Sequence, residues 1–376
     1  MQANTLNPTP EPRRNVGIDI ARGIAMLLVI YEHAIEMYFR GTGPQPAVVF
    51  DQWQFISSFR MPLFFVISGF LYRPRSHEKA LQNALMLLFT AYITHTLCWG
   101  LDAVAGPNKP WIGGLVLPFF TLNDFYSVTV WFLAALALIQ LSFHCLLVLG
   151  GWRRNLFACA IGAGFLLDQV QNTNLFQLSA LLPGILFYGF GHWLSRSHHA
   201  HPRTTQALGL AIVGFIVTAS LAPLNSGCLT ELMGNCPNKE GDFGVLILAG
   251  EYGQPVLFLV TAWIGSMAVI WFSAFLADRG GLCARSLSWV GRRTLDLLLL
   301  NGFVIWFIQP WLRQHVMGDS QFQATAVSAL VVLAHVALLP AAQPLTRGIA
   351  AIAGWAAKTL CAVGRRPLQL SKTEME

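Results

Sequence analysis

The first long apolar segment of the chain, residues 16–38, contains ionisable side chains that a plain membrane anchor does not need. They are Asp19, Arg22, Glu32, His33 and Glu36. A charged residue at the centre of a bilayer helix costs about 2.5–3.5 kcal/mol on insertion scales, so such residues indicate a functional site. A histidine beside carboxylates suits general base or nucleophilic catalysis. The segment therefore predicts acid–base chemistry within the membrane.

Helical spacing places Asp19, Arg22 and His33 on one face of a helix. Arg22 and His33 lie about three helical turns apart, which is about 16 Å along the helix axis. Asp19 lies one turn before Arg22 and can pair with its guanidinium. Glu36 lies one turn after His33 and can hold its ring. Simpler interpretations exist, because an arginine can snorkel to the headgroups and a histidine can link two helices. The shared face favours a site.

A second apolar segment, residues 51–72, also contains an arginine, Arg60. Ser68 precedes a glycine, and this small pair permits close helix packing. Arg73 and Arg75 follow the segment. A planar guanidinium suits phosphate or carbonyl oxygens. The last two arginines also fit ordinary positive charge at the cytoplasmic end of a span.

The composition requires a membrane protein to position these residues. Of the 376 residues, 55% are hydrophobic and 11% are charged, and the mean hydropathy is +0.53. A soluble domain carries about 25% charged residues. These values exclude ordinary cytosolic enzymes, disordered proteins and disulfide-stapled secreted domains. We predict an all-α, polytopic transmembrane helical bundle of about ten spans, with a range of nine to eleven. The predicted spans are residues 16–38, 51–72, 80–101, 128–149, 155–168, 175–195, 206–223, 253–276, 290–312 and 322–341.

The last part of the chain differs from these spans. Residues 345–362 are amphipathic and include Lys358, which predicts an interfacial helix or an additional terminal helix. The chain is therefore divided into a polar N-terminal tail (1–15), a membrane domain (16–341) and an amphipathic, basic C-terminal segment (342–376).

The basic residues alternate between the two sets of loops. Most of the 24 lysines and arginines fall in one set, and the opposite set holds only Arg40, Lys109, Lys239 and Arg313. Lysine and arginine mark cytoplasmic loops, so both termini are predicted to be cytoplasmic, which requires an even number of spans. This topology accounts for the net charge of +6, and nucleic acid is not an expected partner. The polar N-terminus is not typical of a cleavable signal peptide.

The seven cysteines do not suggest a metal site. No Cys-x-x-Cys pair occurs, so we predict neither a metal nor a permanently bound cofactor. Cys228 and Cys236 share the loop 224–252 on the predicted outer side. There they form a disulfide or remain two separate thiols.

The two charged segments together resemble the acyltransferase-3 family of integral membrane acyltransferases. Asp19, Arg22, Gly23 and His33 match the N-terminal pattern of that family, and residues 57–72 are close to its most recognisable stretch.

Two later stretches, residues 130–140 and 288–303, are similar to the family in a weaker way. Asn301 stands where many relatives have a histidine, so the second histidine of those relatives is not expected here. By residue match, the resemblance implies that His33 is catalytic, as a general base or as an acyl carrier, and that Arg22 is its essential partner.

The resemblance also implies a multi-pass protein of the bacterial inner membrane that works as an O-acetyltransferase in exopolysaccharide biosynthesis. The expected donor is acetyl-CoA or another acyl-CoA from the cytoplasm. The expected acceptor is a polysaccharide or its lipid-linked oligosaccharide precursor. Membrane lipids and polysaccharide-assembly machinery are the other expected partners. The catalytic set is completed by Asp19 and Glu36, and the candidates for donor binding are Arg60, Ser68, Arg73 and Arg75.

Two other functions agree with the composition. A transporter of polysaccharide or lipid-linked sugar would spread polar residues over many helices and show internal repeats. A catalytically inactive membrane scaffold of the same fold would not need Arg22 and His33. The intramembrane charges concentrate in the first two segments and no repeat is evident, so we predict an acyltransferase.

Overall fold

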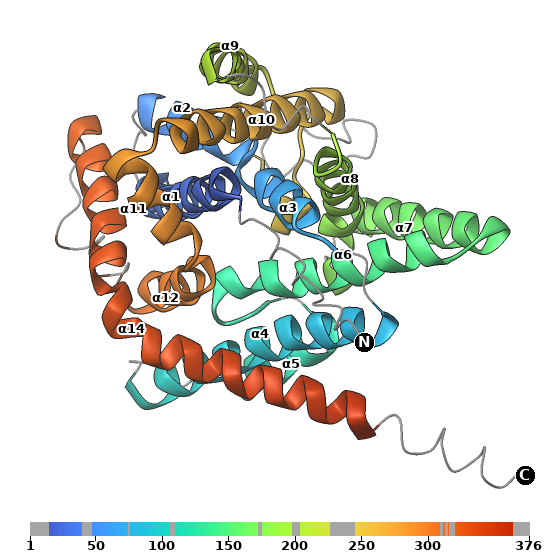
Figure 1. Cartoon of the computed structure of the whole chain (residues 1–376). Helices are drawn as coiled ribbons and strands as arrows, with labels where there is room; N and C mark the ends of the chain where they lie inside the picture. The colour runs from blue at the N-terminus through green and yellow to red at the C-terminus, as the bar shows by residue number, and fades with distance from the viewer. Residues whose placement is uncertain are drawn as a thin grey trace, which may run out of the picture.

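The computed structural model describes residues 15–39, 47–73, 76–105, 110–122, 124–171, 175–197, 204–225, 245–308, 311–312, 315 and 320–363. Helices make up nearly all of this part of the chain (Figure 1). They are α1 (Val16–Phe39), α2 (Ala47–Ser57), α3 (Arg60–Phe70), α4 (His77–Ala105), α5 (Ile112–Thr121), α6 (Trp131–Val148), α7 (Gly151–Gln171), α8 (Leu178–Leu194), α9 (Thr204–Leu221), α10 (Pro255–Arg279), α11 (Gly281–Gly291), α12 (Thr294–Phe307) and α14 (Gln321–Val363). The short 3-10 helices used below are η1 (Val128–Val130), η2 (Leu175–Gln177) and η5 (Ile247–Ala249).

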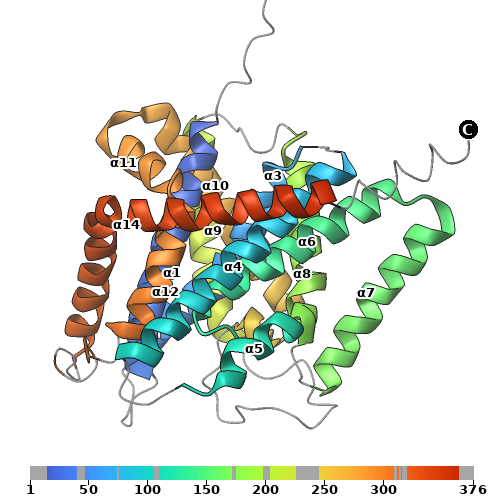
Figure 2. The same cartoon turned by 90° about the horizontal axis from the view of Figure 1, so that it is seen from below.

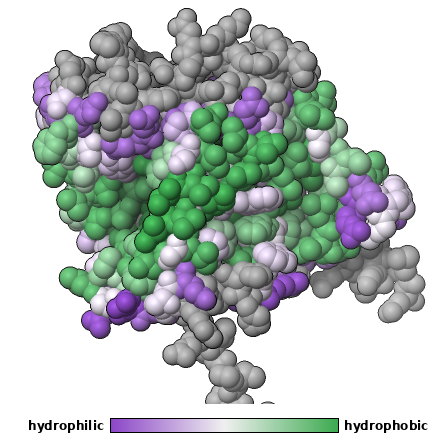
Figure 3. Space-filling view, turned by 90° about the horizontal axis from the view of Figure 1, so that it is seen from above, coloured by the Kyte–Doolittle hydropathy of each residue, from purple (hydrophilic) through white to green (hydrophobic). Residues whose placement is uncertain are grey.

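The predicted all-α membrane bundle is confirmed. A broad apolar band crosses the face drawn in Figure 3, and hydrophilic side chains border it on both sides, as a bilayer requires. Among the described residues, α4, α9, α10, α14 and the continuous segment of η1 and α6 are long and apolar enough to cross a membrane. α5, α8 and α12 are shorter apolar helices. The count of ten spans stays a prediction.

The second predicted span is two helices rather than one. α2 ends at Ser57 and α3 begins at Arg60. Pro62 explains the break, because its ring clashes with the carbonyl of the residue four positions earlier, which is Ser58. The Ser58 hydroxyl donates to the carbonyl oxygen of Phe55 at 2.7 Å, which supports the end of α2. The break places Arg60 at the start of a separate helix.

The end of the chain also differs from the prediction. The predicted span 322–341 and the amphipathic segment 345–362 form one helix, α14, which Figures 1 and 2 show sharply bent into two arms. Pro340 and Pro344 lie inside it, and a proline is the usual cause of such a kink. α5 was not predicted, and α11 precedes the predicted span 290–312 as a separate helix.

Two pairs of glycines allow helices to touch backbone to backbone. A Cβ on Gly23 of α1 would overlap the carbonyl oxygen of Leu287 in α11, and one on Gly291 would overlap the carbonyl oxygen of Asp19. Gly69 of α3 and Gly191 of α8 are related in the same way to the facing helix. Small residues permit such close packing within membranes. The glycine after Arg22 therefore fixes α1 against α11.

α1 is the central helix of the bundle. It contacts α2, α3, α10, α11, α12 and α14. The beginning of α1 and the end of α14 lie on the same side of the molecule (Figure 2). The assignment of that side to the cytoplasm stays a prediction.

Candidate active site

A cavity of about 1280 Å³ lies beside α1 and is lined by residues of α1, α3, α6 and α12, among others. Arg22, His33 and Glu36 all line it. The fourteen positions from Arg22 to Glu36 correspond to about 21 Å along the helix. The cavity therefore follows α1 lengthwise, and we refer to its Arg22 end and its His33 end.

Two neighbouring helices, α12 and α3, also extend along the cavity. α12 packs beside α1 (Figure 2), and Thr294 at its start contacts Arg22. α3 runs the opposite way, because Arg60 at its start pairs with Glu32 near the far end of α1. Leu71, just after α3, also lines the cavity, about three turns from Arg60 and thus back at the Arg22 end. Three helices therefore connect one end of the cavity with the other.

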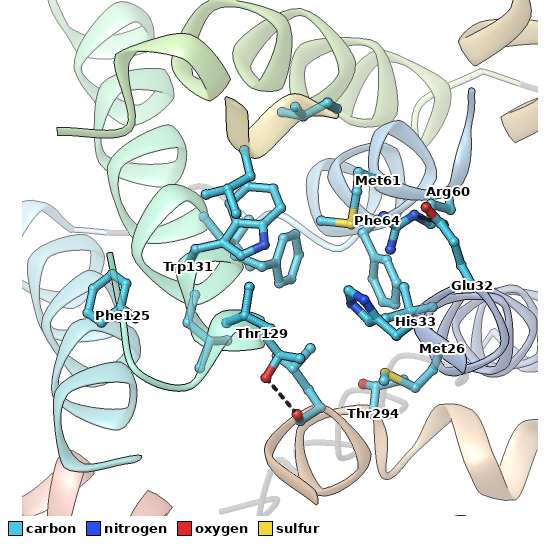
Figure 4. A pocket seen from close by; sticks show the side chains of 18 of the residues that line it. Met26, Glu32, His33, Arg60, Met61, Phe64, Phe125, Thr129, Trp131 and Thr294 are labelled. Atoms are coloured by element: carbon cyan, nitrogen blue, oxygen red, sulfur yellow. Dashed lines mark hydrogen bonds and ion pairs between the residues drawn. The ribbon is translucent and has the colours of Figure 1, made fainter. Parts of the chain in front are cut away.

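His33 projects from α1 into the cavity (Figure 4). Its Nδ1 lies 3.4 Å from Oε2 of Glu36, one turn later on the same helix. This is the contact that the spacing in the sequence predicts. When Nδ1–H donates to Glu36, Nε2 keeps its lone pair and is the basic atom of the ring. The geometry can therefore present a neutral imidazole as base or nucleophile.

Glu32 and Arg60 form an ion pair between α1 and α3 next to His33 (Figure 4). Arg60 Nε faces Oε2 of Glu32, and both side chains are buried. Glu32 adjoins His33 in the sequence, but neighbouring positions on a helix do not face each other. The structure brings Glu36 to His33 and gives Glu32 to Arg60. The buried Arg60 guanidinium therefore places N–H donors close to the His33 imidazole, and Glu32 balances its charge.

Arg22 lies at the other end of the cavity. Its Nη2 donates to Oγ1 of Thr294 at 2.8 Å. This bond fixes the guanidinium between α1 and α12, at a position where Arg22 lines the cavity. Asp19 is buried near α11 and does not line the cavity.

The candidates for donor binding fall in different places. Ser68 lines the cavity in α3, and Arg60 lines it at the His33 end. Arg73 is exposed beyond the end of α3 and does not line the cavity. Arg75, Cys228 and Cys236 lie outside the residues that the structure describes.

Several lining residues were missed by sequence reasoning. Thr294 belongs to the weakly similar stretch 288–303. The available indication was that an arginine within the membrane needs a hydrogen-bond acceptor, which a side chain of another helix can provide. Trp306 also lines the cavity, and its ring centroid lies 4.2 Å from that of Tyr126, an aromatic residue between the third and fourth predicted spans that lines the cavity as well. Residues 245–249, which include η5, close another part of the wall, and no pattern in the sequence indicated them.

The rest of the wall is apolar. Phe64 of α3, Trp131 of α6 and Met26 of α1 surround the space in front of His33 (Figure 4). Apolar walls exclude water and lower the local dielectric constant, which strengthens the electrostatic interactions of the polar groups that they enclose. Among the described residues, no group of three or more His, Cys, Asp or Glu could hold a metal ion. The site therefore offers one imidazole, its carboxylate partner and two fixed guanidinium groups along an apolar passage.

Comparison with known proteins assigns the family. No curated protein and no solved structure matches the chain. A family model for the acyltransferase domain of the acyltransferase-3 family matches residues 15–342. The matched region contains every residue of the cavity. The chain therefore belongs to the acyltransferase-3 family of membrane acyltransferases.

Proposed function

We propose that this protein transfers an acetyl group from acetyl-CoA to a sugar hydroxyl of an exopolysaccharide or of its lipid-linked precursor. The observation that carries the proposal is the cavity along α1, with Arg22 at one end and His33 at the other. The distance of about 16 Å between these levels is comparable to the reach of the pantetheine arm of CoA. A donor that enters at the Arg22 end can thus present its thioester to His33.

The donor is assigned to the Arg22 end for electrostatic reasons. CoA carries phosphate groups, and guanidinium groups bind phosphate with a planar fork of donors. Arg73 and Arg75 follow α3, whose last turn reaches this end, so we assign them to the phosphates. Ser68 lines the path of the pantetheine arm. Arg60 stands at the level of His33, so we assign it to the thioester carbonyl rather than to a phosphate.

His33 is the proposed catalytic residue, and direct transfer is one route. Nε2 removes the proton from the acceptor hydroxyl as the hydroxyl oxygen attacks the thioester carbonyl carbon. The carbon–sulfur bond then breaks, and the CoA thiolate takes the proton from the imidazolium. The products are the acetyl ester and CoA thiol. Glu36 holds the ring through Nδ1 and stabilises the imidazolium while it exists.

An acyl-histidine route uses the same groups. Here Nε2 attacks the thioester carbonyl, and CoA leaves as a thiolate. The acceptor hydroxyl then attacks the acetyl carbon, the bond from that carbon to the ring nitrogen breaks, and the hydroxyl proton is taken up by the CoA thiolate. Both routes need a neutral imidazole at His33. Both also place the acceptor at the His33 end, opposite the donor. We infer that the Arg22 end faces the cytoplasm of a bacterial inner membrane, that both termini lie on that side, and that the acceptor approaches from outside.

A complementation experiment tests this function. Cells that make this protein are deprived of it and supplied with the wild type, His33→Ala or the control His315→Ala, whose exposed imidazole lies outside the cavity. We expect His33→Ala to lower the base-labile acetyl content of the surface polysaccharide at least about hundredfold, which is the usual scale of general base catalysis. The control should retain the wild-type content. Normal acetylation by well-expressed His33→Ala would overturn the proposal, as would a polysaccharide that is fully acetylated but not exported.

A further inference from the structure

The His33 end of the cavity contains an aromatic pair that the proposed chemistry does not use. Tyr126 and Trp306 both line the cavity, and their rings lie 4.2 Å apart at 50°. Trp306 lies twelve positions after Thr294 on α12, about 18 Å from the level of Arg22. Because α12 and α1 run together from that level, Trp306 stands close to the height of His33. The pair is therefore at the acceptor end.

Tyr126 is held from several directions. Its backbone N–H donates to Nδ1 of His95 at 2.8 Å, and its hydroxyl donates to Oδ2 of Asp102. His95 is fixed in turn, because its Nε2–H donates to the carbonyl oxygen of Leu115 at 3.1 Å. Tyrosines often lie at the membrane interface with the hydroxyl among the headgroups, whereas the Tyr126 hydroxyl binds a carboxylate of the protein. The position of the Tyr126 ring is therefore set by α4, independently of the bilayer.

The charged side chains that line the cavity at this end have a net negative charge. Among the residues that line the cavity, Asp124 lies two positions before Tyr126 and Glu36 lies one turn after His33, and Arg60 is already paired with Glu32. Arg22, the other lining arginine, stands at the opposite end. A carboxylate accepts hydrogen bonds from hydroxyl groups and repels an anion. An aromatic face provides apolar contact for the C–H face of a sugar ring.

We propose that Tyr126, Trp306 and Asp124 form the acceptor subsite, and that it takes an uncharged sugar ring. The ring stacks on Trp306, its hydroxyl groups donate to Asp124, and the hydroxyl to be acylated points toward His33. A uronic acid or a phosphorylated sugar is rejected by the two carboxylates. This inference rests on the proposed function and adds to it the class of sugar and the residues that select it.

The test uses three variants and two readouts in cells that depend on the supplied protein. Trp306→Ala removes the stacking surface, Trp306→Phe keeps an aromatic ring, and Trp111→Ala removes an exposed tryptophan that does not line the cavity. The first readout is the base-labile acyl content of the surface polysaccharide. The second is the protection of each purified protein by CoA against thermal unfolding, which reports the donor end alone.

We expect Trp306→Ala to lower the acyl content at least tenfold, Trp306→Phe to stay within threefold of the wild type, and Trp111→Ala to match it. CoA should protect all of these proteins equally. Mass spectrometry of the wild-type polysaccharide should place the acyl group on an uncharged sugar. Asp124→Asn, which removes the charge at an exposed side chain, should lower the acyl content severalfold with CoA protection intact.

Several results would overturn the subsite. The first is wild-type acylation by both Trp306→Ala and Asp124→Asn, each tested as a single variant. The second is loss of CoA protection in Trp306→Ala and Trp306→Phe. The third is an acyl group on a uronic acid or a phosphorylated sugar. If His33→Ala abolishes acylation in the same cells, such a result leaves the proposed function standing. If His33→Ala acylates normally, the proposed function itself fails.

Discussion

Arg60 of α3 and Glu32 of α1 form an ion pair that is buried beside His33. The pair joins the first two charged segments of the chain, since it connects α1 to α3. The break that Pro62 introduces is what places Arg60 at the start of α3. It also fixes the antiparallel arrangement of α1 and α3, which places Leu71 at one end of the cavity and Arg60 at the other. One interaction thus determines both the depth of the guanidinium and the direction of a cavity wall.

The burial of this pair predicts a strongly non-additive effect on stability. Glu32→Gln leaves the Arg60 charge buried without its partner, which costs about 3–5 kcal/mol. The double variant Glu32→Gln with Arg60→Met leaves no buried charge, so its thermal unfolding temperature in detergent should lie above that of Glu32→Gln alone. Equal or additive losses in the double variant would show that the two charges do not depend on each other.

The bond between Arg22 and Thr294 predicts a second effect. A hydrogen bond to a charged group contributes about 1.5–3 kcal/mol, so Thr294→Val should lower the transfer rate roughly tenfold to hundredfold. Thr294→Ser keeps the hydroxyl and should retain most of the activity. Arg22→Lys should fail like Arg22→Ala, since a single ammonium cannot reproduce the planar fork. Near-normal turnover by Arg22→Lys would mean that only the charge is needed.

The contact between His33 and Glu36 predicts a change in catalysis with little change in stability. Glu36→Gln keeps the size of the side chain and removes the carboxylate that stabilises the imidazolium. We expect the maximal rate to fall at least about tenfold, since general base catalysis depends on the orientation and charge of the base. The Michaelis constant for acetyl-CoA should stay near the wild-type value, because the donor phosphates bind at the other end. A changed Michaelis constant with an unchanged rate would contradict the assignment.

The close contact of α1 with α11 predicts a failure of assembly. A Cβ on Gly23 would overlap the carbonyl oxygen of Leu287, which is backbone and cannot move aside cheaply. Gly23→Ala should therefore give little monodisperse protein after purification. Gly100→Ala is the matched control, because a Cβ there meets open space and alanine favours the helix by about 1 kcal/mol. Normal yield and stability of Gly23→Ala would show that the helices can separate.

The sequence indicated much of the site because its decisive residues share one helix. The spacing of Arg22, His33 and Glu36 on α1 is set by helix geometry alone, so their common face was predictable. Composition was enough for the helical membrane class. The contact between His33 and Glu36 followed from a separation of one turn.

The remaining contacts depend on tertiary packing. No local pattern links Glu32 with Arg60, or Arg22 with Thr294, because each pair joins different helices. The backbone of Asp19 meets Gly291 of α11, where the glycines bring the two helices together, and no local pattern in the sequence indicates this contact. The kink in α14 shows that apolar runs locate helical residues but not the angle between the arms of a bent helix.

The central claim is that acyl groups pass from a donor at the Arg22 end to an acceptor at the His33 end through the imidazole of His33. Inverted membrane vesicles from cells that make the protein expose the cytoplasmic side and retain the natural acceptor. Labelled acetyl-CoA added to these vesicles should place base-labile label on glycan or lipid-linked sugar when the wild type is present. Vesicles with His33→Ala should incorporate none above the level of cells without the protein. Equal incorporation by wild-type and His33→Ala vesicles would contradict the account.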